Sequence, residues 1–333
     1  MIIDILLFIA GLVFILISAE LFTNGVEALG DKLNLSQNFT GSILAAIGTA
    51  LPETILPIIA IFFFGHNHGH DIGVGAILGA PFMLSTLAFP LVGITVLIGY
   101  FLLKKRSLEI NIETIGFRRD LVFFLFAYSV ALFIVPFEDH LLRIFTALFL
   151  LGIYILYVFL TLKGESQEME EVEHLYFAPK NPEPSILIIL LQVIVSLIIM
   201  ITGANIFIKG LENISIAIGF PALIFSLLVA PIATELPEKI NSVLWILRGK
   251  DTLAVGNISG AMVFQSTIPV SIGVVFTQWD ITGLAFVSGI FTIMAGFIAL
   301  VTSYVEKKLI PFGLTLGGMF YIIYIFLVIK QNF

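Results

Sequence analysis

Thr49-Ala50-Leu51-Pro52-Glu53 and Thr234-Glu235-Leu236-Pro237-Glu238 nearly repeat each other, and each stretch lies inside a long apolar run. A carboxylate at membrane depth is costly unless it is paired, hydrated or bound to an ion, so both are candidate functional groups. Each carboxylate also follows directly after a proline, which disturbs a helix. The duplication therefore predicts an ion transporter that is built from two related halves.

The composition is that of a protein embedded in a lipid bilayer. Of the 333 residues, 59% are hydrophobic and 12% are charged, whereas soluble domains carry about 25% charged residues. The chain has no cysteine, which excludes disulfides, thiolate metal sites and a cysteine nucleophile. No basic stripe accompanies the net charge of −7, so we expect no nucleic-acid partner, and no protein partner can be inferred.

Ten apolar runs are long enough to cross a bilayer as helices, which takes roughly 20 residues each. They are residues 3–28, 38–64, 72–102, 119–137, 139–163, 184–209, 216–246, 252–277, 281–304 and 309–329. No basic segment precedes the first run, so we expect a transmembrane helix there rather than a cleaved signal peptide. The sequence thus predicts an all-α integral membrane protein with ten transmembrane helices.

The basic residues sort to one side of such an arrangement. Twelve of the sixteen Lys and Arg residues fall on the same side when ten helices are assumed. Cytoplasmic loops are enriched in these residues, so we expect a cell-membrane protein with both termini outside. An acidic linker at 164–183 is then cytoplasmic, and it separates a first repeat at 1–163 from a second at 184–333.

The internal repeat extends beyond the two carboxylates. At a constant offset of 185 residues, Gly25 matches Gly210 and Glu53 matches Glu238; further along, at an offset of 181, Gly79 matches Gly260. Each predicted half contains five helices, and this odd number inverts the second half relative to the first. Inverted repeats of this kind place their binding site near the bilayer midplane.

Proline and threonine near the two carboxylates predict a site made of oxygen ligands. Pro52 has no N–H, so the carbonyl of Gly48 loses its helical partner, and Pro237 has the same effect on Ala233. A freed carbonyl, a threonine hydroxyl and a carboxylate then lie within about 1.5 helical turns. Such hard oxygen ligands suit Ca²⁺, Na⁺, Mg²⁺ or Mn²⁺.

These stretches, together with Gly256-Asn257-Ile258-Ser259-Gly260, resemble the two α-repeats of the cation/calcium exchanger superfamily, the sodium/calcium exchangers and their relatives. The resemblance covers nearly the whole chain. It implies two inverted five-helix halves that exchange Ca²⁺ for Na⁺ or H⁺ by alternating access. It also implies that Glu53 and Glu238 are paired calcium ligands, with oxygen from Thr49 and Thr234. The metal cations are cargo, and no permanently bound cofactor is implied.

Several positions depart from the pattern of that superfamily. Ala50 and Glu235 stand where a serine usually follows the threonine, and the later polar position is Leu84 in the first half and Gln265 in the second. Side chains that would help to hold Na⁺ are therefore missing, which leaves the counter-ion open between Na⁺ and H⁺. Gln265 could serve as a neutral metal ligand.

Glu235 has two alternative interpretations. Lys239 follows it by four residues, so the two share a helix face and could form an ion pair. Alternatively, Glu235 is a third acidic metal ligand or a proton carrier. In a predicted outer loop, His66, His68 and His70 could capture Zn²⁺ or sense pH, although a solvated loop is the simpler expectation.

Two other functions compete with that of a secondary antiporter. The missing polar residues are compatible with a degenerate exchanger-like protein that has a structural or regulatory role. Paired carboxylates could also act as the acid and base of an intramembrane enzyme. Such an enzyme needs a substrate groove and an activated water, and no motif marks either, so we expect a transporter.

Overall fold

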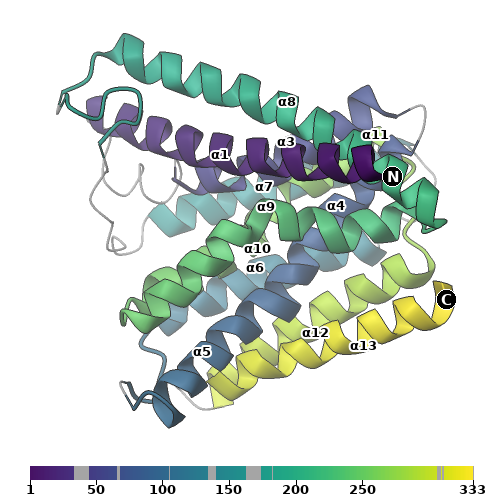
Figure 1. Ribbon diagram of the computed structural model, residues 1–333. Helices are drawn as coiled ribbons and strands as arrows, with labels where there is room; N and C mark the ends of the chain where they lie inside the picture. The colour runs from purple at the N-terminus through teal and green to yellow at the C-terminus, as the bar shows by residue number, and fades with distance from the viewer. Residues whose placement is uncertain are drawn as a thin grey trace.

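Helices make up nearly all of the described chain, because apolar segments in lipid must satisfy their backbone groups internally. The computed structural model describes residues 1–33, 45–65, 68–104, 106–133, 140–162, 174–181, 183–305, 309 and 311–332, without the side chains of 45–49, 233, 236–238, 305 and 332. Its elements are α1 (Ile2–Lys32), α3 (Ala45–Phe63), α4 (Gly69–Met83), the π-helix η2 (Leu84–Ala88), α5 (Phe89–Phe101), α6 (Thr114–Phe133), α7 (His140–Leu162), α8 (Ile186–Ile218), α9 (Ala222–Leu247), α10 (Asp251–Gln265), α11 (Ile268–Phe276), α12 (Gly283–Val305) and α13 (Pro311–Asn332) (Figure 1).

Every predicted apolar run contains a helix of the described chain. Among the described residues, seven helices are long and apolar enough to cross a membrane. Two of these are composite, because α4, η2 and α5 form one rod (Gly69–Phe101) and α10 with α11 another (Asp251–Phe276). α3 and α9 contribute shorter apolar segments, Ala50–Phe63 and Ala222–Ile232. The predicted number of ten crossings therefore stays a prediction.

The predicted break between the sixth and seventh apolar runs is misplaced. The sixth run is predicted to end at residue 209 and the seventh to begin at 216, whereas α8 continues to Ile218 and α9 begins at Ala222. Gly219 then ends the helix in a left-handed conformation with φ of 67°, which glycine adopts at little cost. The short polar stretch before it extends the helix rather than forming a loop.

α1 and α8 lie side by side and antiparallel along one edge of the molecule (Figure 1). A Cβ on Gly25 would lie 2.9 Å from Val193, and a Cβ on Gly210 would lie 2.6 Å from the backbone nitrogen of Phe8. The two glycines are 185 residues apart, and so are Phe8 and Val193. The two contacts are therefore equivalent under exchange of the halves, and each requires glycine for the close approach of the helices.

Small residues also bring α4 against α9. A Cβ on Gly75 or Gly79 would run into the backbone carbonyl of Leu223 or Leu227, respectively. Ser226 of α9 reinforces the contact by donating a 2.7 Å hydrogen bond to the carbonyl of Ile72. The small residues of α4 thus allow its backbone to approach that of α9 closely.

The end of the predicted linker is packed against the helices. Leu175 is buried, and the N–H groups of Tyr176 and Phe177 donate to the side-chain oxygens of Asn24 and Gln192 at 3.2 and 2.9 Å. One buried apolar side chain and two side-chain amides thus dock residues 174–178 on α1 and α8, while His174, Tyr176 and Phe177 stay exposed. The acidic part of the linker lies outside the described residues.

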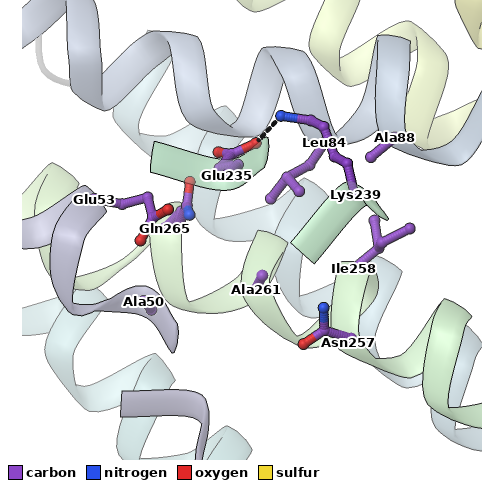
Figure 2. Close-up of a pocket in the computed structure, with 10 residues that line it drawn as sticks. All are labelled: Ala50, Glu53, Leu84, Ala88, Glu235, Lys239, Asn257, Ile258, Ala261 and Gln265. Carbon is purple, nitrogen blue, oxygen red and sulfur yellow. Dashed lines mark hydrogen bonds and ion pairs between the residues drawn. The ribbon is translucent and has the colours of Figure 1, made fainter. Parts of the chain in front are cut away.

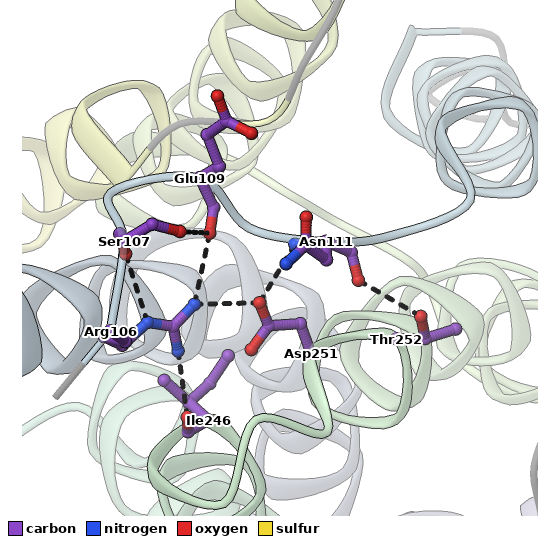
Figure 3. A network of polar contacts seen from close by, with 7 residues as sticks. All are labelled: Arg106, Ser107, Glu109, Asn111, Ile246, Asp251 and Thr252. Carbon is purple, nitrogen blue, oxygen red and sulfur yellow. Dashed lines mark hydrogen bonds and ion pairs between the residues drawn. The ribbon is translucent and has the colours of Figure 1, made fainter.

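A polar network holds the segment after α5 to the start of α10 (Figure 3). Arg106 forms an ion pair with Asp251 at 2.8 Å and donates to the carbonyl of Ile246 at 2.9 Å. The backbone N–H of Asn111 donates to the same Asp251 oxygen at 2.9 Å. Asp251 is the first residue of α10, so the network positions the helix that carries polar residues into the site.

Candidate cation-binding site

Charged and amide side chains from three helices gather in one cavity (Figure 2). The cavity has an empty volume of about 360 Å³, its opening included. Its lining residues come from α3, α9, α10 and the rod of α4, η2 and α5. They are Ala50, Glu53, Leu84, Ala88, Glu235, Lys239, Asn257, Ile258, Ala261 and Gln265. Half of this wall is aliphatic, so the charges are poorly screened and interact strongly.

Glu53 lies at the junction of this cavity with a second one. It is buried on α3, a helix that contains Pro52 and Pro57. The second cavity has an empty volume of about 180 Å³ and is lined by Glu53 and Thr234 together with six apolar or proline residues. Pro57 follows Glu53 by four residues, so the backbone carbonyl of Glu53 also lacks its usual helical donor. Several oxygen atoms are thereby concentrated around one position on α3.

Glu235 and Lys239 form the ion pair that their helical spacing predicts. The Lys239 Nζ lies 2.7 Å from Glu235 Oε2, and the two side chains are 6% and 2% exposed. The same ammonium group lies 3.5 Å from the carbonyl of Pro231. A buried charge is costly without a partner, and this pair neutralises two of them on one face of α9.

Asn257 and Gln265 extend the polar wall along α10. Gln265 is buried at the end of the helix and is drawn between the carboxylates of Glu53 and Glu235 in Figure 2. Asn257 is a lining residue that the sequence motif alone does not predict as part of the site. The signal was available in the spacing, because Asn257, Ala261 and Gln265 follow one another at intervals of four and so share a helix face.

Not every predicted ligand can be placed. Thr49 and Glu238 lie on α3 and α9, but their side chains are outside the described ones. Thr234 is buried and faces the second cavity, where its hydroxyl donates to the carbonyl of Ala230 at 3.3 Å. That hydroxyl oxygen keeps lone pairs that can accept a proton donor or coordinate a cation.

The π-helix η2 interrupts the rod of α4 and α5 beside the cavity. Leu84 and Ala88, its first and last residues, line the wall. π-turns inside α-helices occur frequently at functional sites. The hydroxyls of Ser85 and Thr86 donate to the carbonyls of Pro81 and Phe82 of the preceding turn, so they serve the helix backbone, as hydroxyls in membrane helices often do.

Two of the three loop histidines, for which a solvated loop is the simpler expectation, are described: His68 and His70. His68 Nδ1 lies 3.8 Å from Asp71 Oδ2, and both side chains are exposed. Among the described side chains, no group of three or more His, Asp or Glu residues is arranged to hold a metal ion. His66 lies outside the described residues.

Comparison with known proteins identifies the family. The sodium/calcium exchanger protein family matches residues 3–163 and 188–331 of this chain. The chain belongs to the sodium/calcium exchanger family. Among curated relatives of this exchanger-family protein, the putative antiporter CaxA of Alkalimonas amylolytica is 23% identical over 309 residues, which cover 88% of this chain and 86% of the relative. The inner membrane protein YrbG of Escherichia coli is 25% identical and covers 84% of this chain and 82% of its own length.

Solved exchanger structures share the fold. The H⁺/Ca²⁺ exchanger CAX superimposes with a TM-score of 0.75 at 17% identity, covering 98% of this chain and 86% of the other. The sodium–calcium exchanger NCX_Mj, soaked with Na⁺ and Sr²⁺, superimposes with a TM-score of 0.59 at 20% identity, covering 97% of this chain and 98% of the other. The exchanger-family protein is therefore an all-helical membrane protein with the fold of cation antiporters.

Proposed function

We propose that this protein is a secondary active antiporter that exchanges Ca²⁺, or another divalent cation, for Na⁺ or H⁺ at the cavity in Figure 2. The observation that carries the proposal is the buried Glu53 carboxylate, which shares one cavity with Glu235, Asn257 and Gln265. Carboxylate and amide oxygens are the ligands that Ca²⁺ prefers. A buried carboxylate in a membrane protein of this family is best explained by binding of the transported ion.

We propose Glu53 and Glu238 as the principal ligands of the divalent cation. Thr49, Thr234 and Gln265 supply neutral oxygens, and Glu235 stands at the edge of the ligand set because Lys239 holds one of its oxygens at 2.7 Å. Glu53 and Thr234 line one small cavity although they come from different halves of the chain. A site shared between repeats is what alternating access requires, because movement of one half against the other can open it to either side.

The proposed architecture is ten transmembrane helices in two inverted repeats of five. Two observations support it: the family matches the two halves separately, and the equivalent contacts of Gly25 and Gly210 relate α1 to α8. Both chain ends lie at the same end of the molecule in Figure 1, as an even number of crossings requires. We place both termini outside the cell membrane and the linker 164–183 in the cytoplasm, following the distribution of basic residues.

The deciding experiment is Ca²⁺ uptake into proteoliposomes loaded with either Na⁺ or a low-pH buffer, so that each outward gradient drives the exchange in turn. We expect uptake with at least one gradient, and we expect Glu53→Gln to abolish it without unfolding the protein. Glu183→Gln, which changes an exposed carboxylate outside the cavity, is the matched control and should transport normally. Full uptake by Glu53→Gln, or no Ca²⁺ or other divalent uptake by the unmodified protein, would refute the proposal.

A further inference from the structure

Lys239 places a fixed positive charge inside the cation cavity. Its Nζ lies 2.7 Å from Glu235 Oε2 and its side chain is 6% exposed. Long lysine side chains on membrane helices usually extend toward water. Here the chain lies along the aliphatic wall formed by Leu84 and Ala88, and its head remains at Glu235 (Figure 2).

The ammonium group of Lys239 compensates the charge of Glu235 as a bound monovalent cation would. It is a compact single positive charge with carboxylate oxygen of Glu235 at 2.7 Å and the carbonyl of Pro231 at 3.5 Å. The described cavity wall carries two carboxylates, Glu53 and Glu235. With Lys239 present, the formal charge of that wall is −1 instead of −2, so one fewer mobile positive charge is needed to balance it.

We infer that Lys239 is a built-in cation that occupies one cation position, at Glu235, and thereby lowers by one the number of monovalent ions that the site takes up. The inference rests on the proposed function, because it concerns the same cavity. Lys239 is then a specificity-determining residue. Its ammonium group keeps the transported ions from binding at Glu235, whereas Glu53 stays available to the transported cation. A site with the same carboxylates and no lysine would take up one more monovalent ion.

The inference is tested first by Na⁺-dependent melting of the detergent-solubilised protein. NaCl is compared with choline chloride at constant pH and ionic strength. Lys239→Met keeps an unbranched side chain of similar length but leaves the Glu235 carboxylate open to a mobile ion. The melting temperature of this variant should therefore rise selectively with Na⁺. Lys239→Arg keeps the charge, and the double variant Glu235→Gln/Lys239→Met removes both charges, so neither should gain Na⁺ dependence beyond that of the unmodified protein.

A second measurement uses Ca²⁺ binding and covers the case in which Lys239→Met does not fold. Glu235→Gln leaves an uncompensated ammonium in the cavity, so Ca²⁺ affinity should fall by about tenfold or more through repulsion. The double variant should recover most of that loss. In transport, Lys239→Met should raise the number of coupled Na⁺ ions by about one, read from the Hill coefficient for Na⁺.

The outcomes separate this inference from the proposed function. No Na⁺-selective stabilisation of Lys239→Met, or Ca²⁺ affinity that is equally low in Glu235→Gln and the double variant, would overturn the built-in cation and leave only a structural ion pair. A protein that moves no divalent cation would refute the proposed function. The melting comparison would still decide whether Lys239 replaces a bound cation.

Discussion

Ser259 of α10 donates a 2.7 Å hydrogen bond to Asp120 of α6, and both side chains are buried at 0% and 6% exposure. Arg119 also lies 3.3 Å from the other oxygen of Asp120. This contact fixes α10 to α6 at the level of the helix segment that carries Asn257. It links the cavity wall to a helix that does not itself line the cavity.

We expect Ser259→Ala to lower the stability of the protein by about 1–3 kcal/mol, because the buried Oδ2 atom of Asp120 loses the hydroxyl that donates to it. The measurement is thermal unfolding in detergent. Ser196→Ala is the matched control, since Ser196 is equally buried but donates to the carbonyl of Val193 in its own helix. Equal losses for the two variants would mean that the contact between α6 and α10 contributes nothing specific.

Gly79→Ala should destabilise the packing of α4 against α9. The added methyl group would run into the Leu227 carbonyl and lie 2.7 Å from Pro231, and such overpacking costs about 1–3 kcal/mol. Gly152→Ala in α7 is the control, because a Cβ there meets nothing within 4 Å and alanine favours the helix by about 1 kcal/mol. The prediction fails if Gly79→Ala melts at or above the temperature of Gly152→Ala.

Asn257→Ala should weaken Ca²⁺ binding by about tenfold, which corresponds to about 1.4 kcal/mol. The amide oxygen of Asn257 is a hard ligand on the cavity wall, and alanine supplies none. Titration of Ca²⁺ against the purified protein measures the change. Asn205→Ala, whose amide donates to the Ile201 carbonyl away from the cavity, should bind Ca²⁺ normally; equal binding by both variants would remove Asn257 from the site.

The absence of cysteine from the chain allows a direct test of the proposed orientation. Arg248 lies between α9 and α10, Asp280 lies between α11 and α12, and both are exposed. In intact cells, a membrane-impermeant maleimide should label Asp280→Cys and should reach Arg248→Cys only after permeabilisation. The reverse labelling pattern would invert the orientation, and labelling of both from one side would contradict the crossing between them.

Local patterns in the sequence predicted those features that depend on neighbours along one helix. The ion pair of Glu235 and Lys239, one of the two interpretations of Glu235, rested on a spacing of four residues, and the structure shows this pair. The extension of α8 to Ile218 was missed because apolar periodicity does not reveal how far a helix continues past a short polar stretch before a glycine ends it.

Contacts between distant segments could not be read in the same way. The docking of residues 174–178 on α1 and α8 depends on Asn24 and Gln192, which lie roughly 150 residues and 15 residues away along the chain. Nothing in the acidic composition of the linker indicates that its end would find those amides. Asn257 was likewise missed as a site residue, because its place in the cavity depends on which face of α10 meets α3 and α9.

The apolar pattern of the chain is enough to establish a helical membrane protein with a repeated carboxylate, because lipid requires long apolar helices and charged residues within them are rare. Which of those charges lie close together depends on how the helices pack. Glu53 of α3 shares a cavity with Glu235, Lys239 and Gln265 of α9 and α10, since close glycine contacts bring helices from both halves together. Such a meeting depends on packing between distant segments, which no local pattern contains.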